Sequence, residues 1–114
     1  MMVKVVLSPE ASRDLFQIGD YISFTLHNKA AARKLIGRLR DTMRILEKFP
    51  ESGTLLDDTQ PHILYRYLVC GNYLIFYHLS GECACIDRIL YGRRDYMMIL
   101  FGDQLREEAE REES

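Results

Sequence analysis

The residues of this chain with the clearest binding chemistry are tyrosines and arginines in its second half. Tyrosine rings offer flat surfaces for stacking, and guanidinium groups offer forked donors for phosphate or carboxylate. Together they are typical of surfaces that recognise nucleic acid or protein, although strand propensity and packing explain tyrosines equally well. The candidates are Tyr65, Arg66, Tyr67, Tyr73, Tyr77, Arg88, Tyr91, Arg93, Arg94 and Tyr96.

Catalysis has weaker support in the sequence. Metal-independent cleavage of RNA needs a base, an acid and cations around the phosphate. His78 could supply the base or the acid, but no second titratable group lies at an informative spacing, so we predict a structural role for it. The sequence has no glycine-rich phosphate loop, no nucleophile motif and no carboxylate pair in a plausible cleft, and its histidines and cysteines lack metal-ligand spacing. We expect no catalytic residue, no metal and no cofactor.

Charge is unevenly distributed along the chain. The net charge is -2, but residues 29–48 carry seven basic side chains against two acidic ones, an excess of five positive charges. Such a stripe either meets an acidic partner or is the solvated face of an amphipathic helix. Residues 103–114 carry six acidic side chains and two arginines, and we expect this acidic tail to fray.

Turn and periodicity signals predict the elements that position these residues. Residues 1–8 (MMVKVVLS) favour a strand, and Ser8-Pro9-Glu10 favours the start of a helix, because serine caps amides, proline fits the first helical position and glutamate complements the dipole. Apolar residues every three or four positions extend this helix to about residue 28. A second amphipathic helix is predicted over residues 29–48, ended by FPESG.

The remainder of the chain reads as three strands and a short helix. Residues 62–70 and 73–79 form a hairpin around Gly71-Asn72, and residues 82–92 return after a turn at Ser80-Gly81. A short C-terminal helix is predicted after Gly92. The fold class is therefore α+β, with an N-terminal strand and an antiparallel two-helix hairpin packed on a small antiparallel sheet.

The length of 114 residues, with 47% hydrophobic and 28% charged residues, is that of one globular domain. No charged leader precedes the first strand, and no apolar run is long enough to span a bilayer. The three cysteines do not predict a disulfide, because Cys83 and Cys85 lie two positions apart on one expected strand, with diverging side chains. We expect a cytoplasmic protein without a membrane partner.

Four stretches of the chain resemble the RelE/ParE superfamily of bacterial type II toxins. They are SPEASRDLFQIGDYI, FPESG, YRYLVCGNYLIFYHL and, most specifically, IDRILYGRRDYMMIL. The last segment, with Gly-Arg-Arg-Asp-Tyr, is similar to the ParE branch, also called plasmid-stabilisation proteins. The resemblance covers residues 3–101, so we expect a toxin domain over residues 1–101 followed by the tail at 102–114. It also implies two helices on a small antiparallel sheet.

The branches of the superfamily that this chain resembles differ in their target. The nuclease branch cuts messenger RNA with basic strand residues, including an arginine after the tyrosine that follows the glycine turn, where this chain has Leu74. The ParE branch lacks these residues and is associated with poisoning DNA gyrase by binding. We therefore expect a gyrase poison without sequence-specific nucleic-acid binding of its own. A ribosome-dependent mRNA endonuclease and a toxin-like domain that has lost toxicity remain alternatives.

The resemblance also implies a cognate antitoxin, and the distribution of charged and aromatic residues suggests which side chains bind it and the target. We expect antitoxin carboxylates to meet Arg33, Arg40 and Arg44 on the second helix. The expected residues for target binding and toxicity are Tyr65, Arg66, Tyr73, Tyr77, Arg88, Arg93, Arg94, Asp95 and Tyr96.

Arg66 stands alone as a charge in the fifteen-residue stretch 65–79. Strand alternation puts it on the same face as Leu64 and Leu68, so its stem can lie along apolar surface while its guanidinium reaches the rim. A charge so placed needs a partner, and we predict a forked pair with Asp87 or Asp95 that organises the Gly-Arg-Arg-Asp-Tyr site.

Overall fold

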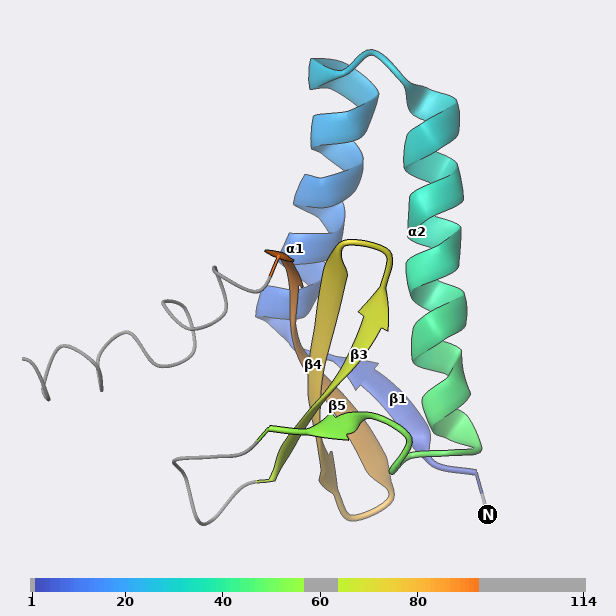
Figure 1. Cartoon of the computed structure of the whole chain (residues 1–114), viewed down its shortest axis with the longest axis vertical. Helices are drawn as coiled ribbons and strands as arrows, with labels where there is room; N and C mark the ends of the chain where they lie inside the picture. Colours follow the sequence, from blue (N-terminus) through green and yellow to red (C-terminus); the bar gives the residue numbers. More distant parts are fainter. Residues whose placement is uncertain (1, 57–63, 93–114) are drawn as a thin grey trace, which may run out of the picture.

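The computed structural model describes residues 2–56 and 64–92. Two helices lie side by side on one face of a five-stranded mixed sheet, whose strand order is β1-β5-β4-β3-β2 (Figure 1). The elements are β1 (Lys4–Leu7), α1 (Pro9–Asp20), η1 (Tyr21–Thr25), α2 (Lys29–Arg44), η2 (Ile45–Glu47), β2 (Thr54–Leu55), β3 (Tyr65–Cys70), β4 (Tyr73–Ser80) and β5 (Cys83–Tyr91).

The two helices begin where the sequence places their caps. The Ser8 hydroxyl oxygen accepts a hydrogen bond from the Ala11 amide at 3.0 Å, with Pro9 in the first turn of α1. The Asn28 side-chain oxygen accepts from the Ala31 amide at 3.0 Å and caps α2 in the same way. Each cap satisfies an amide that the helix leaves without an internal partner.

The helix ends depart from regular α geometry. The expected helix to residue 28 becomes a π-helical turn, η1, after Asp20, and the connection that follows contains His27 at φ 52. The expected helix to residue 48 likewise changes after Arg44 into the 3-10 turn η2. A side chain in the left-handed region is uncommon outside glycine, so His27 marks a tight reversal between α1 and α2.

The expected antiparallel meander is present, but the sheet as a whole is mixed. β3, β4 and β5 pair antiparallel in sequence order, with Gly71 at φ 61 and Gly81 at φ 59 in the connecting turns. The prediction of a purely antiparallel sheet is wrong, because β1 pairs in parallel with β5, from Lys4 opposite Cys83 to Leu7 opposite Ile86. The short strand β2, which pairs with β3, was not predicted.

The core lies between the helices and the sheet. The buried residues that pack there come from α1, α2, η2 and the three long strands, and they are Ala11, Leu39, Met43, Leu46, Cys70, Ile75, Tyr77, Ala84, Ile86 and Ile89. Strand alternation therefore leaves Tyr65, Tyr67 and His78 on the opposite face, which we call the open face. The expected C-terminal helix and acidic tail lie outside the described residues.

Candidate functional site

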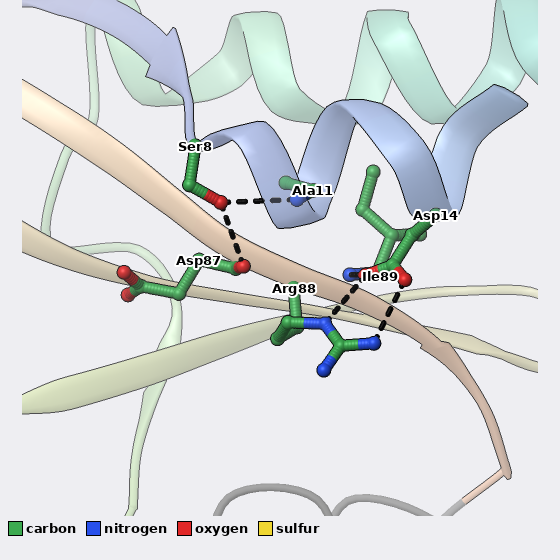
Figure 2. A network of polar contacts seen from close by, with 6 residues as sticks. All are labelled: Ser8, Ala11, Asp14, Asp87, Arg88 and Ile89. Carbon is green, nitrogen blue, oxygen red and sulfur yellow. Dashed lines mark hydrogen bonds and ion pairs between the residues drawn. The ribbon is translucent and has the colours of Figure 1, made fainter.

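A buried ion pair joins α1 to the end of β5. Asp14, only 8% exposed, accepts hydrogen bonds from Arg88 Nε at 2.7 Å and Arg88 Nη2 at 2.8 Å. The same carboxylate accepts from the Ile89 backbone amide at 3.0 Å (Figure 2). The hydrogen bond to Asp14 raises the pKa of Arg88 above its ordinary value. Charge-assisted bonds of this forked kind are among the strongest that side chains make.

This ion pair exists because β1 is shorter than β5. The pairing of β1 ends with Leu7 opposite Ile86, and the chain then leaves the sheet at Ser8, whose hydroxyl donates to the Asp87 carbonyl at 2.9 Å. Beyond Ile86, Asp14 of α1 lies at the β5 edge that β1 does not cover. Its carboxylate accepts the hydrogen bond of the Ile89 backbone amide. Arg88, expected to bind a target, is engaged inside the protein in this structure, and Asp14 was not singled out from the sequence.

Arg66 and Tyr77 both bind the segment between η2 and β2. Arg66 Nη1 donates to the carbonyls of Glu51 at 3.1 Å and Gly53 at 3.0 Å. The fully buried Tyr77 accepts from the Gly53 amide at 2.9 Å and donates to the Pro50 carbonyl at 2.8 Å. A Cβ at Gly53 would lie 2.5 Å from the Tyr77 hydroxyl oxygen, so this close approach requires glycine.

The predicted pairing of Arg66 with Asp87 is wrong. Arg66 lies on the helix side of β3 and turns toward backbone carbonyls, whereas Asp87 contacts His78 on the open face. The alternative partner, Asp95, lies outside the described residues. Arg66 and Tyr77 were expected to bind a target, and their contacts in this structure are those of residues that fasten residues 50–53 to the sheet.

The open face carries a His–Asp pair that sequence spacing did not reveal. His78 Nδ1 lies 2.7 Å from Asp87 Oδ2, and the edge of the Tyr65 ring approaches His78 with centroids 5.8 Å apart. The pairing of β4 and β5 shifts by one residue next to Phe76 and Tyr77, which leaves Asp87 as the extra residue of a β-bulge. The bulge directs the Asp87 carboxylate toward His78.

Burial is the main electrostatic influence on this cluster. It raises the pKa of Asp87 above its ordinary value, against the opposing hydrogen bond from His78. Burial also raises the pKa of Tyr65, to which the Asp87 charge adds. A carboxylate hydrogen-bonded to a ring nitrogen orients the imidazole, an arrangement that is also found at general bases.

The two remaining expected target-binding residues within the described part of the chain, Tyr65 and Tyr73, lie on opposite faces of the sheet. Tyr73 packs against the core from the helix side, and its ring meets Tyr91 edge to face at 5.3 Å. Tyr65 lies on the open face. The four residues of the Gly-Arg-Arg-Asp-Tyr motif that follow Gly92, namely Arg93, Arg94, Asp95 and Tyr96, lie outside the described residues. Their role stays a prediction.

A groove of about 660 Å³ runs between α1 and α2. We call it the helix groove and define it by Leu15, Phe16, Phe24, Ile36, Arg40 and Met43. Phe16 is 73% exposed and Phe24 63% exposed, so its walls present large apolar rings to solvent. Sequence periodicity did not predict these exposed rings, because Phe16 of α1 and Phe24 of η1 lie off the apolar stripe of the first expected helix.

One of the three predicted antitoxin residues lines this groove. Arg40 lines it directly, and all three of Arg33, Arg40 and Arg44 are exposed on α2. Arg44 has one neighbouring carboxylate, Asp41, at 3.7 Å on the surface. Apolar walls beside a row of cations suit a segment that carries apolar anchors and carboxylates.

Two kinds of site are absent from the described residues, namely groups of side chains that could bind a metal ion and helices that could cross a membrane. Within 2–56 and 64–92, no three His, Cys, Asp or Glu side chains come together in a way that could hold a metal ion. No helix of the described part of the chain is long and apolar enough to cross a membrane. Cys70, Cys83 and Cys85 are free thiols.

Comparison with solved structures supports the fold. A structure described as the chromosomal ParDE TA system from P. aeruginosa matches this chain with a TM-score of 0.66 and 18% sequence identity, over 81% of this chain and 98% of that chain. At this identity the match shows a shared fold. No curated protein matches the chain.

The sequence places the chain in the class of small bacterial toxins from type II toxin-antitoxin systems. It matches the family model described as ParE toxin of type II toxin-antitoxin system, parDE, over residues 5–96. The chain belongs to this ParE toxin family, as its Gly-Arg-Arg-Asp-Tyr segment suggested.

Proposed function

We propose that this ParE-family toxin arrests growth by binding and poisoning DNA gyrase, and that a cognate antitoxin neutralises it. One observation favours a toxin that acts by binding over a toxin that cleaves RNA. In the described residues, the open face lacks the cluster of cations that cleavage of a phosphodiester needs, because Arg88 is engaged by Asp14. Leu74, where the nuclease branch has arginine, pairs with Val69 and Leu90.

Cleavage of messenger RNA is the second candidate, and one observation favours it. The His78–Asp87 pair at 2.7 Å supplies a base with an orienting carboxylate, which the sequence alone did not indicate. Both side chains are mainly but not fully buried, so a ligand can reach them. The pair still lacks cations beside it in the described structure, and this deficit places the nuclease second.

We further propose that the antitoxin binds the helix groove. The exposed rings of Phe16 and Phe24 supply apolar contact area, and Arg33, Arg40 and Arg44 supply positive charge along the same helix pair. Charged groups at the rim of an interface act mainly on association rate and salt dependence, whereas apolar anchors provide most of the affinity. The expected occupant is a segment with apolar side chains and acidic residues.

Charge reversal tests this interface with a matched control. Arg40→Glu should weaken binding of the antitoxin and flatten the salt dependence of the dissociation constant, because attraction becomes repulsion at the groove. Arg38→Glu makes the same change on another side of α2, toward Gly71, and should leave affinity within about twofold. Equal affinities and equal salt slopes for the parent and both variants would show that the stripe is merely solvated.

Expression without antitoxin tests toxicity and separates the targets. The proposal predicts growth arrest with broken chromosomes and intact message. Arrest with cut message would favour the nuclease. Normal growth while soluble, folded protein accumulates would eliminate both active-toxin hypotheses and leave the toxin-like domain without toxicity.

A further inference from the structure

A second groove, of about 620 Å³, lies between α1 with η1 and the end of β5. We call it the tyrosine groove and define it by Ile18, Tyr21, Leu26, Tyr73, Ile89 and Tyr91. Tyr21 is 55% exposed and Tyr91 59% exposed. The groove therefore presents aromatic rings to solvent on a side of α1 that the helix groove does not use.

The tyrosine groove follows from the unequal lengths of β1 and β5. β5 runs from Cys83 to Tyr91, but β1 covers its edge only as far as Ile86. Beyond that point α1 lies beside β5, and Asp14 satisfies the Ile89 amide at the groove (Figure 2). One carboxylate, that of Asp14, thus accepts a hydrogen bond from the β5 edge, and aliphatic and aromatic side chains make up most of the remaining lining.

The chain leaves β5 at the rim of this groove. Tyr91 lines the groove, and the next residue, Gly92, is fixed by its amide donating to the Asn72 carbonyl at 2.9 Å and by a positive φ of 75. The sequence then continues with three charged residues and the run Tyr96-Met-Met-Ile-Leu-Phe101. Three residues separate Gly92 from Tyr96, so the four steps between them span roughly 14 Å at most.

We propose that residues 96–101 of the same chain occupy the tyrosine groove. The run is six residues without a charge. The acidic tail that follows it would be costly to bury among apolar rings. Methionine side chains adapt to irregular surfaces and make favourable sulfur contacts with aromatic rings, which suits Met97 and Met98. A short tether also gives the segment an effective concentration on the order of millimolar at the groove.

The docked segment would hold the motif between two fixed points. Gly92 anchors one end at the turn after Asn72, and Tyr96 would anchor the other end in the groove. Arg93 and Arg94 would then project from a short loop at the molecular surface. A role of these arginines in toxicity rests on the proposed function, whereas the docking itself does not.

Methyl-labelled methionine in the full chain provides the test by NMR. Docking predicts contacts from the Met97 and Met98 methyl groups to the rings of Tyr21, Tyr73 or Tyr91, and amide exchange of residues 97–101 at least tenfold slower than in a free peptide. Tyr21→Ala should reduce that protection severalfold. Phe16→Ala, which removes an exposed ring from the helix groove instead, should leave it unchanged.

Each other outcome overturns the proposal. Random-coil methyl shifts with unprotected amides would show an unoccupied groove, and contacts from these methyls to Phe16 or to the open face would place the segment elsewhere. Contacts that appear only between differently labelled molecules would identify a second copy as the occupant. Leu26→Ser serves as a second groove variant should Tyr21→Ala unfold. Because neither antitoxin nor gyrase is present, failure of the toxicity proposal would not alter this result.

Discussion

Asp14→Asn should be one of the most destabilising isosteric changes in this protein. The substitution removes the charge that Arg88 meets through two hydrogen bonds of 2.7 and 2.8 Å, while an amide oxygen remains for Ile89. Breaking a buried ion pair by removing one partner costs about 3–5 kcal/mol, and Arg88 retains a side-chain exposure of 24%. We therefore expect a loss of about 2–4 kcal/mol in the free energy of unfolding.

Equilibrium unfolding in urea, followed by circular dichroism, measures this loss. With an m-value on the order of 1.5 kcal/mol/M, the midpoint should fall by about 1.3–2.7 M. Asp41→Asn is the matched control, because its partner Arg44 lies 3.7 Å away and both side chains are largely exposed. The control should change stability by less than about 0.5 kcal/mol.

The double variant Asp14→Asn with Arg88→Met measures how much the interaction between the two side chains contributes to the free energy of unfolding. Removing both charges leaves no unpaired guanidinium, so the double variant should be more stable than the sum of the single changes predicts, by about 1–2 kcal/mol. A loss below about 0.5 kcal/mol for Asp14→Asn, or additive single changes, would refute the assignment of Asp14–Arg88 as the bond that holds α1 to β5.

Three further substitutions have defined outcomes. Arg66→Ala should lower stability and toxicity together, because residues 50–53 lose two hydrogen bonds. The double variant Arg93→Ala with Arg94→Ala should lower toxicity at nearly unchanged stability. An Arg66→Ala protein that melts like the parent but is not toxic would mean that Arg66 acts on the target directly. Because burial raises the pKa of Asp87 above 3.8, its contribution to stability is complete below pH 3.8 and is lost as pH rises through the folded pKa. The stability of the parent relative to Asp87→Asn should therefore decline between pH 3 and 6 in urea unfolding, and a flat difference would contradict the raised pKa. His78→Ala should keep most of its toxicity in growth assays, and a folded but inert variant would favour the nuclease.

Local rules predicted much of the framework from sequence. The Ser8 cap, the glycine turn at Gly71 and the alternation of β3 each depend on residues within a few positions of one another. Such features follow from backbone geometry and one hydrogen bond, so neighbouring residues suffice to predict them.

The candidate site was harder to predict because its contacts join distant parts of the chain. Asp14 and Arg88 are 74 residues apart, and their meeting depends on the parallel insertion of β1 beside β5 and on where β1 ends. The His78–Asp87 contact depends on a bulge that one sequence does not reveal. Arg66 was predicted to pair with Asp87 or Asp95, but within the described residues its guanidinium binds backbone carbonyls beside β2 and not Asp87.

One measurement in two parallel arms tests the central claim most directly. Purified toxin is supplied to gyrase with supercoiled DNA and, separately, to translating ribosomes, with the antitoxin added as a control in each arm. The account predicts cleaved DNA trapped on gyrase, relief by the antitoxin, and intact message on the ribosomes. Cut message together with unaffected gyrase would contradict it.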